Sequence, residues 1–140
     1  AIIPTQTGMD SDPLYENGIA SAIPARGGGF WCGTINDGFL FKFEPKTAVV
    51  INKGKSFQYW NLKSLAYGND DILYMLGGRD EDNSWLMSYN GILGSLSCLG
   101  WPENTAQCSV ICTDKKGRII MAENLRHSFI WVYDPTKVVK

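Results

Sequence analysis

The sequence has almost no excess of charge of either sign. Its 13 Lys and Arg are balanced by 14 Asp and Glu, which gives a formal net charge of −1. A nucleic-acid-binding domain usually carries a basic face, and a disordered chain combines high net charge with low hydrophobicity. With 44% hydrophobic residues, this chain fits neither description. We therefore expect a folded protein with no nucleic-acid partner.

Long apolar runs are also missing. No stretch approaches the roughly 20 apolar residues that a membrane-spanning helix needs, so no membrane span is expected. The chain does not open with a charged segment followed by an apolar one, and no signal peptide is expected there. The sequence leaves the compartment open, with a lean toward a secreted or periplasmic protein.

Metal-ligating residues are scarce. The chain has four cysteines and one histidine, and no two cysteines form a CxxC pair, so a zinc site is not expected. Cys108 and Cys112 would lie about 13 Å apart along a strand, too far for a disulfide. A bridge between Cys98 and Cys108 is sterically possible. The alternative is that the cysteines, including Cys32, are small buried thiols.

Familiar catalytic motifs do not occur either. The sequence has no GxSxG, no HExxH, no P-loop and no GxGxxG. An EF-hand loop begun at Asp80 would need glycine at its sixth position, where Trp85 stands, and glutamate at its twelfth, where Gly91 stands. We therefore expect no cofactor and no dedicated metal site.

Aromatic residues are abundant, and they recur with a period. A short aromatic and β-branched run closed by a turn is found at Phe39–Thr47, Trp85–Gly91 and Phe129–Lys137. The aligned aromatics Phe43, Tyr89 and Tyr133 are 46 and 44 residues apart. Further short strands with tight turns precede and follow each run. This pattern predicts an all-β chain of four-stranded antiparallel units, at about 18–55, 62–100 and 107–140.

Four short strands repeated at about 45 residues are typical of a β-propeller blade. The second unit, in which Ile72–Leu76 leads into Gly77-Gly78 and then Tyr89, resembles a kelch blade. The third unit, with Asp114–Arg118 leading to Tyr133–Thr136, resembles gluconolactonase-type propellers. Both resemblances imply a propeller fold over nearly the whole chain.

Three blades do not make a ring, because closed propellers have about four to eight. Val138-Val139 barely begins a fourth strand of the last unit, and residues 1–3 form a possible closing strand. We therefore expect the chain to be part of a larger closed propeller. Its partners would be other copies, two of them giving six blades, or another chain.

The loops of the predicted meander differ between its two sides. Loops after the first and third strands are tight-turn material such as Gly27-Gly28 and Asn90-Gly91, and backbone geometry explains them. Loops after the second and fourth strands mix aromatic with polar residues, which is typical of a binding face. The ligand-binding candidates on this rim are Trp60, Trp101, Arg79, Arg126, Asp37 and Asn124.

The favoured hypothesis is a binding or scaffold propeller that presents this rim to a protein or carbohydrate. An alternative is a polysaccharide lyase or hydrolase acting on acidic glycans, in which the two arginines neutralise a uronate and His127 or Tyr59 moves the proton. A third possibility is a metal-dependent lactonase-type propeller using Glu123 and Asn124. Each candidate also has an ordinary structural interpretation, as inter-blade packing for the tryptophans and as a solvated surface for the charges.

Overall fold

The computed structural model describes residues 18–56, 61–78, 84–102, 107–124 and 128–137. Most of these residues lie in β-strands and the others in turns and loops, and among them there is no α-helix, only the 3-10 turn η1 (Pro135–Lys137). The strands are β1 (Ile19–Pro24), β2 (Phe30–Thr34), β3 (Phe39–Glu44), β4 (Val49–Lys55), β5 (Asn61–Tyr67), β6 (Leu73–Gly78), β7 (Trp85–Asn90), β8 (Ser95–Gly100), β9 (Cys108–Thr113), β10 (Ile119–Glu123) and β11 (Ile130–Tyr133). No helix in this part of the chain could span a membrane.

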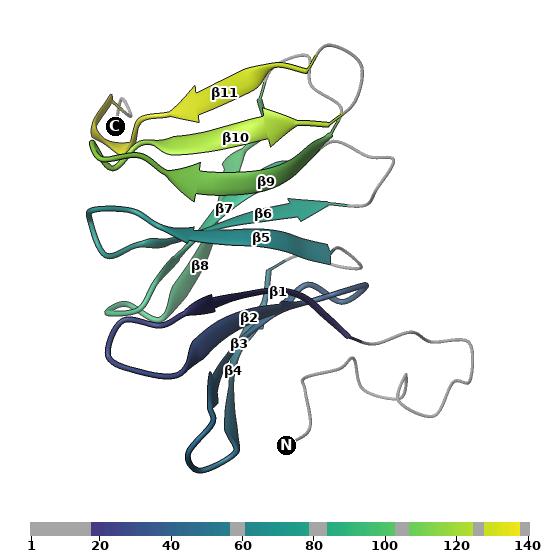
Figure 1. The fold of residues 1–140 in the computed structure, drawn as a ribbon, viewed down its shortest axis with the longest axis vertical. Coiled ribbons are helices and arrows are strands. Elements are labelled where there is room, and N and C mark those ends of the chain that lie inside the picture. Colours follow the sequence, from purple (N-terminus) through teal and green to yellow (C-terminus); the bar gives the residue numbers. More distant parts are fainter. Residues whose placement is uncertain (1–17, 57–60, 79–83, 103–106, 125–127, 138–140) are drawn as a thin grey trace.

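The strands form three antiparallel meanders stacked on one another (Figure 1). The first sheet has the order β1-β2-β3-β4, the second β5-β6-β7-β8, and the third β9-β10-β11. The first strands of the three sheets, β1, β5 and β9, lie next to one another along the stack. The predicted all-β fold with blade-like antiparallel sheets is confirmed, and the described residues do not close the stack into a ring. Residues 1–3 and 138–140 lie outside the described residues.

The ladders of the three sheets repeat one another in register. Equivalent pairs are Phe30 with Phe43, Leu73 with Tyr89, and Ile119 with Tyr133. The first strand of each sheet also has an irregularity near its start, where one residue is skipped in the pairing. Such bulges increase the local twist of a strand. The aromatics aligned from the sequence therefore occupy the same place in each sheet.

Two apolar clusters hold the sheets together. In the first, Trp31 and Leu40 of the first sheet pack against Leu65, Met75 and Met87 of the second. Side chains along a strand point alternately to the two faces of the sheet. The second sheet therefore packs one set of residues against the first sheet and another set against the third. Burying each large apolar side chain stabilises the fold by roughly 1.5–3 kcal/mol.

The second cluster joins the second and third sheets. Leu76 and Leu86 meet Ile111, Ile119 and Met121, all of which are buried. An aromatic pair recurs at equivalent places in the two interfaces. The ring centroids of Trp31 and Tyr89 are 5.4 Å apart, and those of Tyr74 and Tyr133 are 5.9 Å apart.

Hydrogen bonds between sheets supplement the apolar contacts. The Ser21 hydroxyl donates to the Leu62 carbonyl at 2.6 Å. The Ser84 hydroxyl accepts from the Cys108 amide at 2.8 Å and donates to its carbonyl at 3.1 Å. Ser84 is buried, so this exchange satisfies polar groups that would otherwise be costly to remove from water.

All four cysteines are free thiols. Cys32 and Cys108 are buried, as the packing interpretation expects, while Cys98 and Cys112 are exposed. The bridge between Cys98 and Cys108 that the sequence allowed is not formed. Burial raises the pKa of the Cys108 thiol, and the nearby Glu123 charge raises it further.

The Tyr74–Tyr133 pair carries a prediction about pH. Burial and the Asp70 carboxylate, which accepts a 2.9 Å hydrogen bond from Tyr74, raise the pKa of Tyr74. Burial and the same carboxylate raise the pKa of Tyr133. Unfolded tyrosine ionises near pH 10, so above that pH the unfolded chain loses protons that the folded chain keeps. The free energy of unfolding is therefore expected to fall as pH rises above about 10.

Urea unfolding measured between about pH 8 and 11 tests this expectation. Tyr74→Phe should make the fall in unfolding free energy shallower, because one of the two responsible groups is gone. An equally steep fall in the variant would show that other groups cause it.

Candidate functional site

The structure describes three of the residues predicted on the rim. Trp101 follows β8 and is 54% exposed, Asn124 follows β10 and is exposed, and Asp37 lies in the loop between β2 and β3 and is fully buried. The other candidates lie outside the described residues, so their roles stay predictions. These are Tyr59, Trp60, Arg79, Arg126 and His127.

The Asp37 loop is held by short-range hydrogen bonds. The Asp37 amide donates to the Ile35 carbonyl at 2.6 Å, and the Phe39 amide donates to the Thr34 hydroxyl at 2.9 Å. Asn36 has a φ of 61°, in the left-handed region that asparagine tolerates. The Asp37 side chain is buried in this loop, and its role in ligand binding stays a prediction.

Glu123 is the last residue of β10 and Asn124 follows it, and both hydrogen-bond to adjacent segments of the backbone. The Asn124 amide donates to the Gln107 carbonyl at 3.1 Å, and a Glu123 carboxylate oxygen accepts from the Phe129 amide at 3.4 Å. Glu123 is only 8% exposed. Within the described ranges, no three His, Cys, Asp or Glu side chains gather where they could hold a metal ion. The lactonase-type hypothesis thus has no ligand cluster in this part of the chain.

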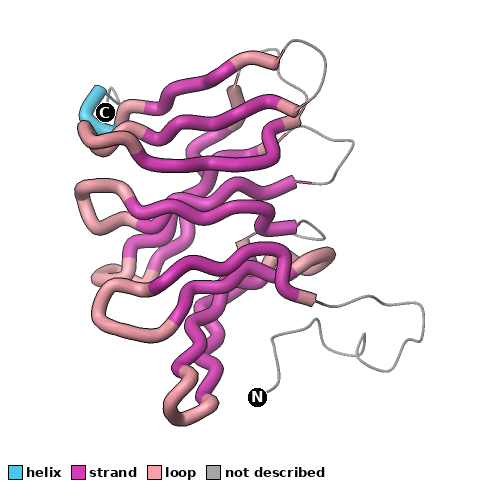
Figure 2. The backbone as a smooth tube through the Cα atoms, in the orientation of Figure 1, coloured by secondary structure: helices cyan, strands magenta, loops and turns pink. Residues whose placement is uncertain are grey.

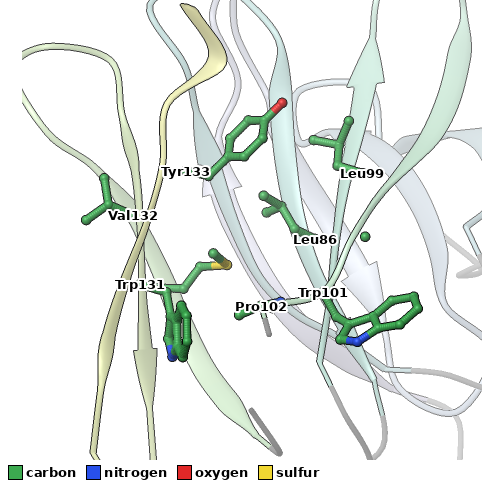
Figure 3. A pocket seen from close by; sticks show the side chains of 9 residues that line it. Leu86, Leu99, Trp101, Pro102, Trp131, Val132 and Tyr133 are labelled. Carbon is green, nitrogen blue, oxygen red and sulfur yellow. The ribbon is translucent and has the colours of Figure 1, made fainter. Parts of the chain in front are cut away.

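A groove of about 170 Å³ lies between the second and third sheets (Figure 3). Its lining residues are Leu86, Leu99, Gly100, Trp101, Pro102, Met121, Trp131, Val132 and Tyr133. Trp131 and Trp101 stand on opposite sides, with Pro102 between them, and the Val132 side chain points away. Two tryptophans of different blades thus flank one apolar groove.

Trp101 is held in place although half of it is exposed. Its ring makes an edge contact with Trp85, with centroids 4.4 Å apart and an interplanar angle of 63°. Gly100, with a φ of 115°, turns the chain at the end of β8. Few rotamers are open to an indole fixed on one side by another ring, so Trp101 offers a preorganised apolar face.

The lining of this groove is largely apolar. None of its nine residues carries a carboxylate, imidazole, thiol or amine. The ionisable group is the Tyr133 hydroxyl, and burial raises its pKa, so it stays neutral. A neutral phenol among apolar side chains can orient a ligand but does not supply an acid–base pair.

A second cleft, of about 300 Å³, was not anticipated from the sequence. It lies between the first and second sheets on the side of the tight turns, and its lining includes Arg26, Tyr67 and Asp71. In Figure 2 the turn after β1 and the turn after β5 lie at the same edge of the stack. The sequence repeat could have indicated this cleft, because residues 26 and 71 both lie in the turn after the first strand of their units, and the two units are adjacent.

Comparison with known proteins finds likeness in structure alone. No protein-family model matches the chain, and no curated protein matches it. It is similar to the extracellular domain of BT4673 from B. thetaiotaomicron, named in one structure as part of a one-component system, with a TM-score of 0.64 and 18% identity over 86% of this chain. In another structure, named as part of a hybrid two-component system, the TM-score is 0.66 with 15% identity over 94% of this chain.

These similarities concern the fold. The chain spans only 16% and 17% of the length of the two structures. Identity this low shows a shared arrangement of sheets and carries no residue roles across.

Proposed function

We propose that this chain is a ligand-binding part of an extracellular β-propeller. Three observations support the proposal: the stack of blade-like sheets, its likeness to a structure named as the extracellular domain of a hybrid two-component system, and a preformed aromatic groove without reactive groups. We also propose that the blades are of the kelch type. No observation on the described residues favours the lyase alternative.

The proposed ligand is a carbohydrate that stacks on Trp101. The single observation that carries this choice is the half-exposed indole, fixed by Trp85 at the mouth of the groove. Indole faces pack well against the apolar faces of sugar rings, and the Tyr133 hydroxyl can orient a sugar hydroxyl. Trp60, Arg79, Arg126 and Asn124 are proposed to add contacts from the rim.

Trp101→Ala is expected to weaken glycan binding by about tenfold or more, because a central aromatic anchor commonly contributes more than 1 kcal/mol. A glycan array identifies the ligand, and isothermal titration then compares the affinities. Ile92→Ala is the matched control, since Ile92 is an apolar side chain that is 94% exposed on a turn. Equal affinities in Trp101→Ala and wild type would refute the assignment of this site.

We also propose that further blades, from other copies or from another chain, complete the propeller. Support comes from the third sheet, whose outward face carries exposed Val110, Ile130 and Val132. Ile120 occupies the ladder position that Trp31 and Tyr74 occupy in the other sheets, where each is covered by the next sheet. An apolar face in the same place, with no sheet packed against it among the described residues, favours a docking partner of the same kind.

A further inference from the structure

The cleft between the first and second sheets has a polar edge and an apolar floor. It lies on the side of the first turns, away from the groove of Trp101. Its lining residues are Arg26, Trp31, Tyr67, Asp71, Leu73, Tyr89 and Gly91. Four strands and three turns contribute to it, so the cleft exists only because the two sheets are stacked.

The polar edge is positioned by the backbone of two turns. Arg26 precedes three glycines in the left-handed region, and the Ala25 amide closes this turn by donating to the Gly29 carbonyl at 2.9 Å. Asp71 has a φ of 61° in the equivalent turn of the second sheet. The two turns bring the Arg26 guanidinium and the Asp71 carboxylate into an ion pair.

Further contacts fix the arginine. Its guanidinium carbon lies 4.7 Å from the centroid of the Tyr67 ring, and a second nitrogen donates to the Gly68 carbonyl at 3.3 Å. The side chains of Arg26 and Asp71 are 52% and 75% exposed, and an ion pair so exposed adds little stability. Holding the sheets together is therefore a weak explanation for this arrangement.

The floor consists of three buried side chains. Trp31, Leu73 and Tyr89 are 9%, 1% and 4% exposed. The Trp31 indole nitrogen donates a hydrogen bond to the Tyr67 hydroxyl. This bond fixes the oxygen of that hydroxyl at the rim of the floor and uses it as an acceptor, so its own proton can be donated to a ligand.

We propose that this cleft binds one unit of a neutral saccharide. A guanidinium has five N–H donors and a carboxylate about four acceptor sites, so the Arg26–Asp71 pair keeps several of each after pairing. A ligand with neutral hydroxyls can use these sites without breaking the pair. An anion would have to compete with Asp71 for Arg26. The apolar floor meets the C–H face of a sugar ring, as in other small-molecule sites.

The cleft and the Trp101 groove are both proposed to bind carbohydrate, but they have no lining residue in common. An experiment can therefore refute one proposal without refuting the other. Titration of the ¹⁵N-labelled chain with the methyl glycosides of glucose, galactose, mannose and xylose separates them. The Trp31 indole signal reports on the cleft, and the Trp101 indole signal reports on the groove. We expect saturable movement of the Trp31 signal with at least one neutral glycoside.

Arg26→Gln and Tyr67→Phe should each weaken this titration by about tenfold. Arg118→Gln is the matched control, since Arg118 pairs with Asp114 in the first turn of the third sheet, at 2.6 Å, and lines neither cavity. A Trp31 signal unmoved by all four glycosides would overturn the proposal. So would tighter binding of glucuronate than of the neutral sugars, or equal weakening by Arg118→Gln. Dispersed amide spectra of each variant check that it is folded.

Discussion

Gly33→Ala is expected to lower the free energy of unfolding by about 2–3 kcal/mol, a large loss for a change of one methyl group. A Cβ atom at position 33 would lie 2.4 Å from the Leu62 Cβ and 3.0 Å from the Leu62 carbonyl oxygen. Neither atom is the end of a flexible side chain, so the first and second sheets would have to separate. The same methyl group would lie 2.9 Å from the Ser21 hydroxyl and disturb its hydrogen bond to Leu62.

Urea denaturation followed by circular dichroism measures this loss. Gly91→Ala is the matched control, because the nearest atom to its Cβ would be 3.8 Å away. The control should stay within about 0.5 kcal/mol of wild type. Equal unfolding free energies for the two variants would show that the close approach of the sheets at Gly33 does not contribute to the stability of the fold.

Ile130→Lys is expected to abolish self-association of the purified chain. Ile130 is 71% exposed on β11, in the same cross-strand row as Ala122 and Val110. If copies of the chain complete the propeller, this row is buried when the next blade docks. A lysine there would bury an unpaired charge, which costs far more than the lost apolar contact.

Sedimentation velocity over a range of concentrations gives the size of the particle. Wild type should sediment as a species heavier than the 15.5 kDa chain, and Ile130→Lys as a monomer. Ile92→Lys adds the same charge at an exposed turn position and should leave the assembly intact. A wild-type particle of 15.5 kDa at every concentration would contradict assembly from copies.

Local sequence patterns predicted most of the fold. Runs such as Phe39–Phe43 and Ile72–Leu76 alternate with tight-turn residues, and the strands end within a few residues of these signals. The alignment of Phe43 with Tyr89 and Tyr133 could be made because a repeated fold puts equivalent residues at equivalent positions. The strand irregularities could not be foreseen, since no residue type marks them.

The sites were harder to predict because they form between sheets. Trp101 was identified by residue type and loop position, but its contact with Trp85 depends on how two strands pair. Asp37 looked like a surface carboxylate, and only the folded loop shows that it is buried. The Arg26 cleft was missed because its turn was explained by its glycines, whereas its partners come from residues more than 40 positions away.

The second sheet is the one described sheet that has a neighbour on both faces. The first and third sheets each have one such neighbour, so fewer contacts must break to release either of them. In an array held together by nearest-neighbour contacts, stability is graded along the array. The stack should therefore open from its ends, and the groove between the second and third sheets would be lost before the middle sheet unfolds. Any partner that covers the third sheet would stabilise that groove without touching it.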